Sequence, residues 1–275
     1  MSRIRVMETL DRRALAGLRL VDRTTGLRIE APLRITHPAL KIGRNRSGDA
    51  VVLDIVPRTA AERALAAHPA AFEAPPAAPP AGSLSFELLI EDPSGRYLPR
   101  RFALRLPRRP PSPADADPLP ADHLMRPVEI VMMPAPAAPV GPNWSGLRAS
   151  LSRQAADPAD RPLAGALLRV LRRADGAELG QGIADRRGEA FVPIVGIPVI
   201  DFSSDEDPEA VGLTSVPVRL EILTEPAGPA WPPDPDAILA DPQGWGPVSG
   251  TLPEPSLRTG RMSTENLSLV LAPLP

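Results

Sequence analysis

Proline is the residue that most constrains what this chain can fold into. It occupies 38 of the 275 positions, whereas Phe, Trp and Tyr contribute only 5, 3 and 1 residues. Proline lacks an N–H group and has a fixed φ, so it interrupts helices and is excluded from central strands. The sequence therefore predicts short strands joined by stiff loops, around a core of Leu, Val, Ile and Ala.

Apolar and polar residues alternate over short segments, which is typical of strands with one buried face. Turn signals separate these segments, which are 18–35, 84–106, 147–171 and 216–223. The pattern predicts an all-β fold with two antiparallel β-sandwich domains, Ig-like or transthyretin-like, and long Pro-rich loops. We expect a hairpin at 17–29, a strand at 162–172, short helices at 8–16 and 59–67, and a final strand at 266–271.

Composition also predicts the domain boundaries. The stretch RRPPSPADADPLP at 108–120 has the character of a linker. We expect an N-terminal β-sandwich at 1–107, a Pro-rich linker with one strand at 108–142, and a second β-sandwich at 143–275. Within the second domain, 201–209 is expected to be an acidic, solvated loop and 225–255 a long loop.

The charge balance argues against nucleic acid as a partner. The formal net charge is −2, and Lys41 is the only lysine among cationic residues that are otherwise arginines. The pairs Arg100-Arg101 and Arg108-Arg109 form a basic patch around the linker, but few aromatic residues lie nearby to stack on bases. The absence of cysteine excludes disulfides and thiol chemistry. Residues 1–16 lack the apolar region of a secretory signal, and no apolar stretch approaches the roughly 18 residues that span a bilayer. We expect a cytoplasmic protein without membrane insertion. If it belongs to a particle, it would be released as part of that particle.

No motif with catalytic or metal-binding spacing stands out. The three histidines are expected in separate surface loops, whereas a metal site would need two of them to converge with a carboxylate. No G-x-S-x-G is present, the acids of 201–209 lack EF-hand spacing, and 43–48 lacks the P-loop lysine, so a β-turn is expected there. We expect no catalytic, cofactor-binding or metal-binding residues and no enzyme activity. The histidines are His37, His68 and His123.

Aromatic residues in loops are the candidates for partner contact. Trp231 and Trp245 lie within the long loop 225–255, and tryptophan is enriched at interface hot spots. Two interpretations remain open, because the rings either dock on another subunit or fold back to plug an open end of the sandwich. Trp144 and Tyr97 complete the set of partner-contact candidates.

Turn residues of the second half resemble the carboxypeptidase regulatory-like, or transthyretin-like, β-sandwich family. The resemblance rests on PLAGALLRVL at 162–171, Asp175-Gly176, DRRGEA at 185–190 and GIP at 196–198. The chain departs from the family pattern at Ala184, where Thr is common, and in the long loop 224–265. The resemblance implies a module that is noncatalytic in its family.

The N-terminal half carries a second resemblance. The segments 92–99 and 102–107, joined to such a sandwich, are similar to proteins found beside phage-tail-like contractile injection systems. The resulting hypothesis is a non-catalytic structural or interaction subunit of a larger bacterial assembly, with such a particle as the candidate. Its partners would be other protein subunits, and it would need no cofactor. The alternative is a carbohydrate- or small-ligand-binding β-sandwich, which would need an exposed aromatic platform.

Overall fold

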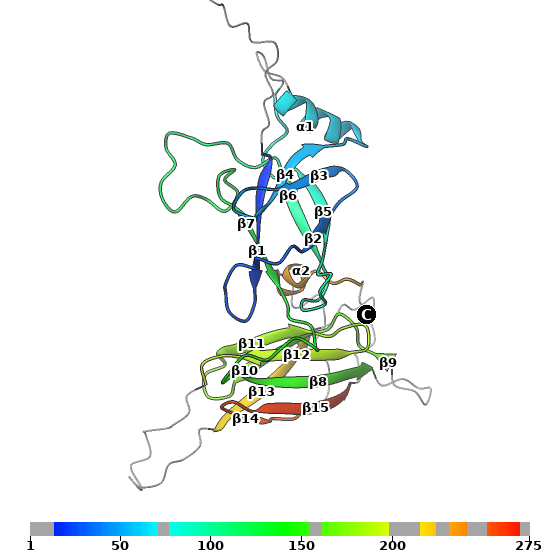
Figure 1. The fold of residues 1–275 in the computed structure, drawn as a ribbon, viewed down its shortest axis with the longest axis vertical. Coiled ribbons are helices and arrows are strands. Elements are labelled where there is room, and N and C mark those ends of the chain that lie inside the picture. Colours follow the sequence, from blue (N-terminus) through cyan, green and yellow to red (C-terminus); the bar gives the residue numbers. More distant parts are fainter. Residues whose placement is uncertain are drawn as a thin grey trace, which may run out of the picture. The chain divides into compact units, whose positions relative to one another are not determined.

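The computed structural model describes residues 14–70, 77–153, 161–197, 215–223, 231–240 and 252–269. Strands form nearly all of the regular structure in these ranges, accompanied by two short helices (Figure 1). The predicted all-β fold is therefore confirmed. The acidic loop 201–209 and most of the helix predicted at 8–16 lie outside the described residues, and Ala16 already begins the first strand.

The chain forms two compact units, each assembled from separate stretches of sequence. Unit 1 contains residues 1–20, 35–88 and 103–130, and unit 2 contains 21–34, 89–102 and 131–275. This division differs from the single predicted linker at 108–142. The last boundary between the two units, between residues 130 and 131, falls within that linker. Two stretches of the N-terminal half, 21–34 and 89–102, nevertheless group with the C-terminal part of the chain.

Two sheets form most of unit 1, although the ends of several of their strands belong to the stretches assigned to unit 2. One has the strand order β3-β4-β1-β7 and the other β2-β5-β6. Residues of β1 are buried at every second position, because one face of this strand lies in the core. The interior is aliphatic, with fully buried Leu18, Val52, Leu88 and Ile130. The strands are β1 (Ala16–Asp22), β2 (Arg34–Thr36), β3 (Leu40–Arg44), β4 (Ala50–Ile55), β5 (Leu84–Glu91), β6 (Arg100–Leu106) and β7 (Val128–Met132).

Helix α1 (Ala60–Ala70) confirms the helix predicted at 59–67 and extends it. Its start is a capping box. The Thr59 hydroxyl accepts the Glu62 N–H at 3.2 Å, and the Glu62 carboxylate accepts the Thr59 N–H at 2.9 Å. The Glu62 carboxylate also accepts the Arg58 N–H. The backbone hydrogen bonds from Arg58 and Thr59 are the largest causes that lower the pKa of Glu62. The helix rests on the unit through Leu65, which is buried.

Unit 2 contains a β-sandwich. One sheet has the order β11-β10-β13-β14, and the other β12-β8-β15 with β9 paired to β8. Leu147, Leu168, Val192 and Leu220 are among the side chains that fill the core between them. The strands are β8 (Ser145–Arg153), β9 (Arg161–Pro162), β10 (Leu167–Arg172), β11 (Glu178–Ile183), β12 (Glu189–Ile194), β13 (Ser215–Leu223), β14 (Ser256–Arg258) and β15 (Met262–Leu269).

The β8–β15 pair departs from the predicted antiparallel arrangement. β15 runs parallel to β8, with Met262 opposite Gly146 and Leu269 opposite Arg153. The two sheets also approach closely where β11 leads into β12. A Cβ on Gly182 would lie 2.2 Å from the Phe191 carbonyl oxygen, so only glycine fits there.

A second core lies on the other face of the β11-β10-β13 sheet. Alternate residues of β10 face opposite sides, so Leu168 enters the sandwich while Leu167 belongs to the second core. Segments 89–102 and 131–138 contribute Leu98 and Met133 to this second core, and helix α2 (Pro235–Ala240) contributes Ile238. This packing explains why stretches from the N-terminal half group with the C-terminal sandwich.

Several local predictions need correction. The predicted hairpin 17–29 forms its turn, with the Asp22 N–H donating to the Leu27 carbonyl, but β1 pairs with β4 instead and only the bridge Val21–Arg28 follows the turn. The strand predicted at 162–172 is split into β9 and β10. Strand β14 and helix α2 were not predicted, and α2 lies within the expected long loop 225–255.

Candidate functional site

The structure places Trp231 against the second core. Its ring packs on the cluster that includes Leu98 and Ile238, and the Arg186 guanidinium lies 5.7 Å from the ring centroid. The ring is half-buried. This packing agrees with the second interpretation, in which the ring folds back onto its own domain. A partner contact through its exposed part stays a prediction.

The other aromatic candidates differ in accessibility. The Trp144 ring is half-buried and lies against Gly141, where a Cβ would be 2.5 Å from the indole. Tyr97 is buried, and its hydroxyl donates to an Asp22 carboxylate oxygen at 2.6 Å. Burial, and then this hydrogen bond, raise the pKa of Tyr97. Tyr97 is therefore unsuited to direct partner contact, and Trp245 lies outside the described residues.

A buried arginine anchors the segment that carries Trp231. Arg100 is only 2% exposed, and its Nη2 donates to Asp234 at 2.9 Å and to Asp236 at 2.8 Å. Its Nη1 donates to the Val131 carbonyl at 2.5 Å. Burial raises the pKa of Asp234 although the Arg100 charge opposes that shift. The predicted basic pair Arg100-Arg101 is thus a structural anchor, since the Arg101 N–H donates to the Pro233 carbonyl.

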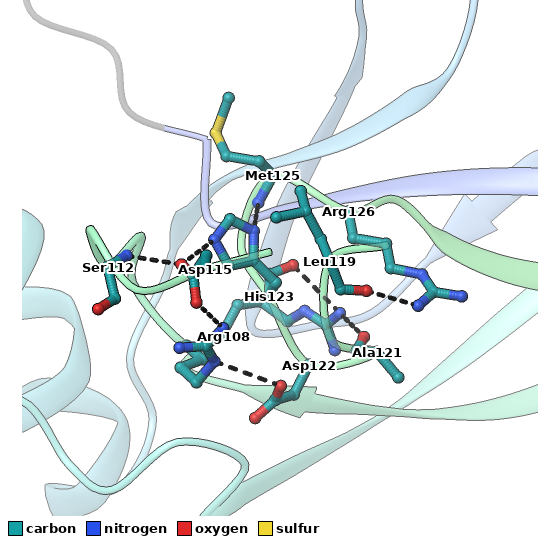
Figure 2. A network of polar contacts seen from close by, with 10 residues as sticks. Arg108, Ser112, Asp115, Leu119, Ala121, Asp122, His123, Met125 and Arg126 are labelled. Carbon is teal, nitrogen blue, oxygen red and sulfur yellow. Dashed lines mark hydrogen bonds and ion pairs between the residues drawn. The ribbon is translucent and has the colours of Figure 1, made fainter. Parts of the chain in front are cut away.

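A network of polar contacts holds a loop of unit 1 in place (Figure 2). The loop between Arg109 and His123 is closed at its base by backbone hydrogen bonds, from the Arg109 N–H to the Asp122 carbonyl and from the Leu124 N–H to the Arg109 carbonyl. Inside it, Asp115 accepts from Arg109 at 2.5 Å and from the Ser112 N–H at 2.6 Å. The hydrogen bond from Arg109 is the largest cause that lowers the pKa of Asp115.

His123 looks like half of a catalytic dyad, but both of its nitrogens are used. The Met125 N–H donates to Nδ1 at 3.1 Å, so the proton of a neutral ring is on Nε2, which donates to Asp115 at 3.1 Å. The ring is 2% exposed. No ring nitrogen is left to accept a proton from a substrate, so this Asp–His pair fixes the loop. The expected surface placement of His123 is wrong.

The remaining histidines have separate surroundings. His37 follows β2 as expected, accepts the Ala39 N–H on Nδ1 at 3.0 Å, and packs edge-on against Phe86. His68 lies in helix α1, whereas a loop was expected. Within the described ranges no three His, Cys, Asp or Glu residues come together as a metal site, and no helix there is long and apolar enough to span a membrane.

Unit 1 also contains an apolar cavity of about 240 Å³. Helix α1 lines it through Leu65 and His68, and the base of the Arg109–His123 loop lines it through Arg108 and Leu124. The Arg108 Nε is buried without a hydrogen-bond partner, and burial lowers the pKa of this guanidinium. The cavity walls belong to segments far apart in sequence, so residue spacing gave no signal for it.

Residues 43–48 form the predicted turn. The Asn45 N–H donates to the Asp49 carbonyl at 3.0 Å, and the Gly48 N–H returns to the Asn45 carbonyl at 3.0 Å. The Arg44 Nη1 donates to the Gly48 carbonyl. These contacts join β3 to β4 and give Gly48 and Arg44 a role in the turn.

No family model matches the chain, and the search of curated proteins finds no match. Among solved structures, the minor pilin GBS52 of Streptococcus agalactiae aligns at a TM-score of 0.26 and 9% identity, over 94% of this chain and 98% of the pilin. The Bacillus anthracis TIE protein aligns at a TM-score of 0.24 and 9% identity, over 94% of this chain and 34% of that one. Both TM-scores are too low to carry an argument about fold or function.

Proposed function

We propose that this protein is a non-catalytic structural or interaction subunit of a larger bacterial protein assembly. The observation that carries the proposal is the Arg109–His123 loop. The buried His123 and the nearly buried Asp115 hold the loop, and both nitrogens of the His123 ring are used within it. A loop fixed before binding loses little conformational entropy on docking, which favours a surface that recognises another protein.

An apolar side chain is also exposed directly after the loop. The Met125 backbone is held by the His123 ring, while its side chain is 68% exposed. Methionine adapts to irregular partner surfaces because it is flexible and polarizable. A fixed backbone with an exposed methionine is the arrangement expected of a small docking element.

Two finer proposals follow from the sequence resemblances. The sandwich of unit 2 is proposed to be a carboxypeptidase regulatory-like module. Positive φ angles at the motif glycines Gly176 and Gly188 support this, since the family motif places turns there. A contractile injection particle is the assembly to test first, because of the resemblance of 92–99 and 102–107.

The test is co-expression of the chain with the products of neighbouring genes, followed by size-exclusion chromatography with light scattering. A stoichiometric complex is expected, and Met125→Asp should weaken it because a charge would have to be buried at the interface. Leu27→Asp, a change at a side chain that is also 68% exposed but lies in unit 2, is the matched control. A chain that stays monomeric with every candidate partner would contradict the proposal.

A further inference from the structure

A polar pocket of unit 2 contains hydrogen-bonding groups that the protein leaves unused. Its volume is about 210 Å³. Strand β11 forms one wall through Glu178 to Gln181, the turn after β1 contributes Arg23 and Thr24, and the end of β12 contributes Pro193 with the following Val195. All of these residues belong to unit 2.

Gln181 is the unusual member of this pocket. It is 4% exposed, and its Oε1 is buried without a hydrogen-bond partner. The Thr24 Oγ1 is likewise buried and unpartnered. Buried polar side chains normally find partners, so two unsatisfied atoms on residues of one pocket indicate that a partner is supplied from outside.

The charged groups at the pocket are already neutralised. The two Glu178 oxygens accept from Arg23 and from Arg169, the latter at 3.0 Å, and Arg169 also donates to Glu221 at 2.6 Å. Two arginines face two glutamates, so the network adds no net charge. A charged ligand would have to be desolvated without a counter-charge, which makes a neutral ligand the better fit.

We propose that this pocket receives a neutral carboxamide, the side chain of an Asn or Gln residue on a partner protein. An amide N–H can donate to the Gln181 oxygen while the amide carbonyl accepts the Thr24 hydroxyl proton, so one group satisfies both atoms. Leu179, Pro193 and Val195 supply apolar walls for the methylene carbons. This inference rests on the proposed function, because it assumes that the partner is a protein.

The binding test uses a small probe, N-acetyl-glutamine N-methylamide, titrated into the 15N-labelled full chain. Amide resonances of Gly180, Gln181 and Val195 should shift with millimolar affinity. Gln181→Met, which keeps the length of the side chain but removes the acceptor, should weaken binding at least tenfold, and Thr24→Val should weaken it to a lesser degree. N-acetyl-glutamate N-methylamide, which has the same shape but is charged, is the matched control and should bind at least tenfold more weakly.

A second measurement is made without ligand. Because Gln181→Met removes an unsatisfied buried acceptor, its unfolding midpoint should rise by about 2–4 °C. A lower midpoint would mean that Oε1 makes a stabilising bond in the free protein, and the inference would be wrong. The inference would also be wrong if the probe gave no shift, or if Gln181→Met bound the probe like wild type. It would be wrong, too, if the sugar N-acetylglucosamine shifted these resonances and the glutamine probe did not.

The two proposals fail in different ways. If wild-type protein joins an assembly and Gln181→Met joins it with equal affinity, only the carboxamide site is wrong. If no assembly forms although the probe binds as described, the proposed function is wrong and the pocket remains an amide site.

Discussion

Arg100→Met tests whether a buried charge holds unit 2 together. Methionine keeps a long side chain, but it cannot donate to Asp234, to Asp236 or to the Val131 carbonyl. Removing one partner of a buried ion pair costs about 3–5 kcal/mol of unfolding free energy. We expect about 3 kcal/mol at pH 7, the lower end, because the Asp236 side chain is half exposed and can be hydrated.

The pH dependence of this loss follows from Asp234. Burial already raises its pKa, and removing the Arg100 charge raises it further. A carboxyl group whose pKa is raised on folding favours the fold below its unfolded pKa, and this contribution is lost as the pH rises through the folded pKa. The stability difference between wild type and Arg100→Met should therefore be largest near neutral pH and smaller toward pH 4.

Urea unfolding followed by tryptophan fluorescence, between pH 4 and 7.5, measures this difference. The matched control is Arg169→Met, which also removes an arginine paired with two acids in unit 2. That arginine is 27% exposed, so the expected loss is about 1 kcal/mol or less. An Arg100→Met loss as small as that of the control, or one that does not change with pH, would refute the buried-charge explanation.

Two further predictions concern close packing and the single tyrosine. Gly182→Ala should destabilise the fold by about 3 kcal/mol, because the new Cβ meets the Phe191 carbonyl oxygen and no rotamer relieves it. Gly176→Ala, where φ is +72° and nothing lies within 4 Å, should cost only about 1–2 kcal/mol in the same thermal melts. Tyr97 is the only tyrosine, so absorbance at 295 nm should show no tyrosinate through pH 10 while the protein is folded. A transition at pH 10 in the folded state would mean that its hydroxyl is not buried against Asp22.

The strands of unit 2 were largely predictable because each carries its own signal. Residues 144–153 alternate apolar and polar residues and form β8, and 216–223 do the same and form β13. Glycines supply the turns between strands, as at Gly188, where φ is +80°. Alternation reports which face of a strand is buried, and turn chemistry reports where the strand ends. Neither depends on distant parts of the chain.

Pairing partners and unit membership were not predictable in this way. Residues 17–29 read as a hairpin, yet β1 pairs with β4 because Leu18 and Val52 are buried together in unit 1. Nothing in 89–102 marks it as a cover for a sheet formed some 70 residues later, at Leu167. Contacts of this kind are set by which apolar faces remain uncovered once the sheets exist, which is a tertiary property.

The candidate sites were even less predictable from the sequence, because a polar residue has a different role when it is buried than when it is exposed. Arg100 and His123 read as a basic patch and a surface histidine, since charged and titratable residues are mostly exposed. In the folded chain both are interior, and each is tolerated because its donors meet carboxylates, Asp234 for Arg100 and Asp115 for His123. Gln181 is equally buried, but its oxygen has no such partner. Anchors and binding sites in this protein are therefore distinguished by whether the buried polar atom is satisfied from within the chain.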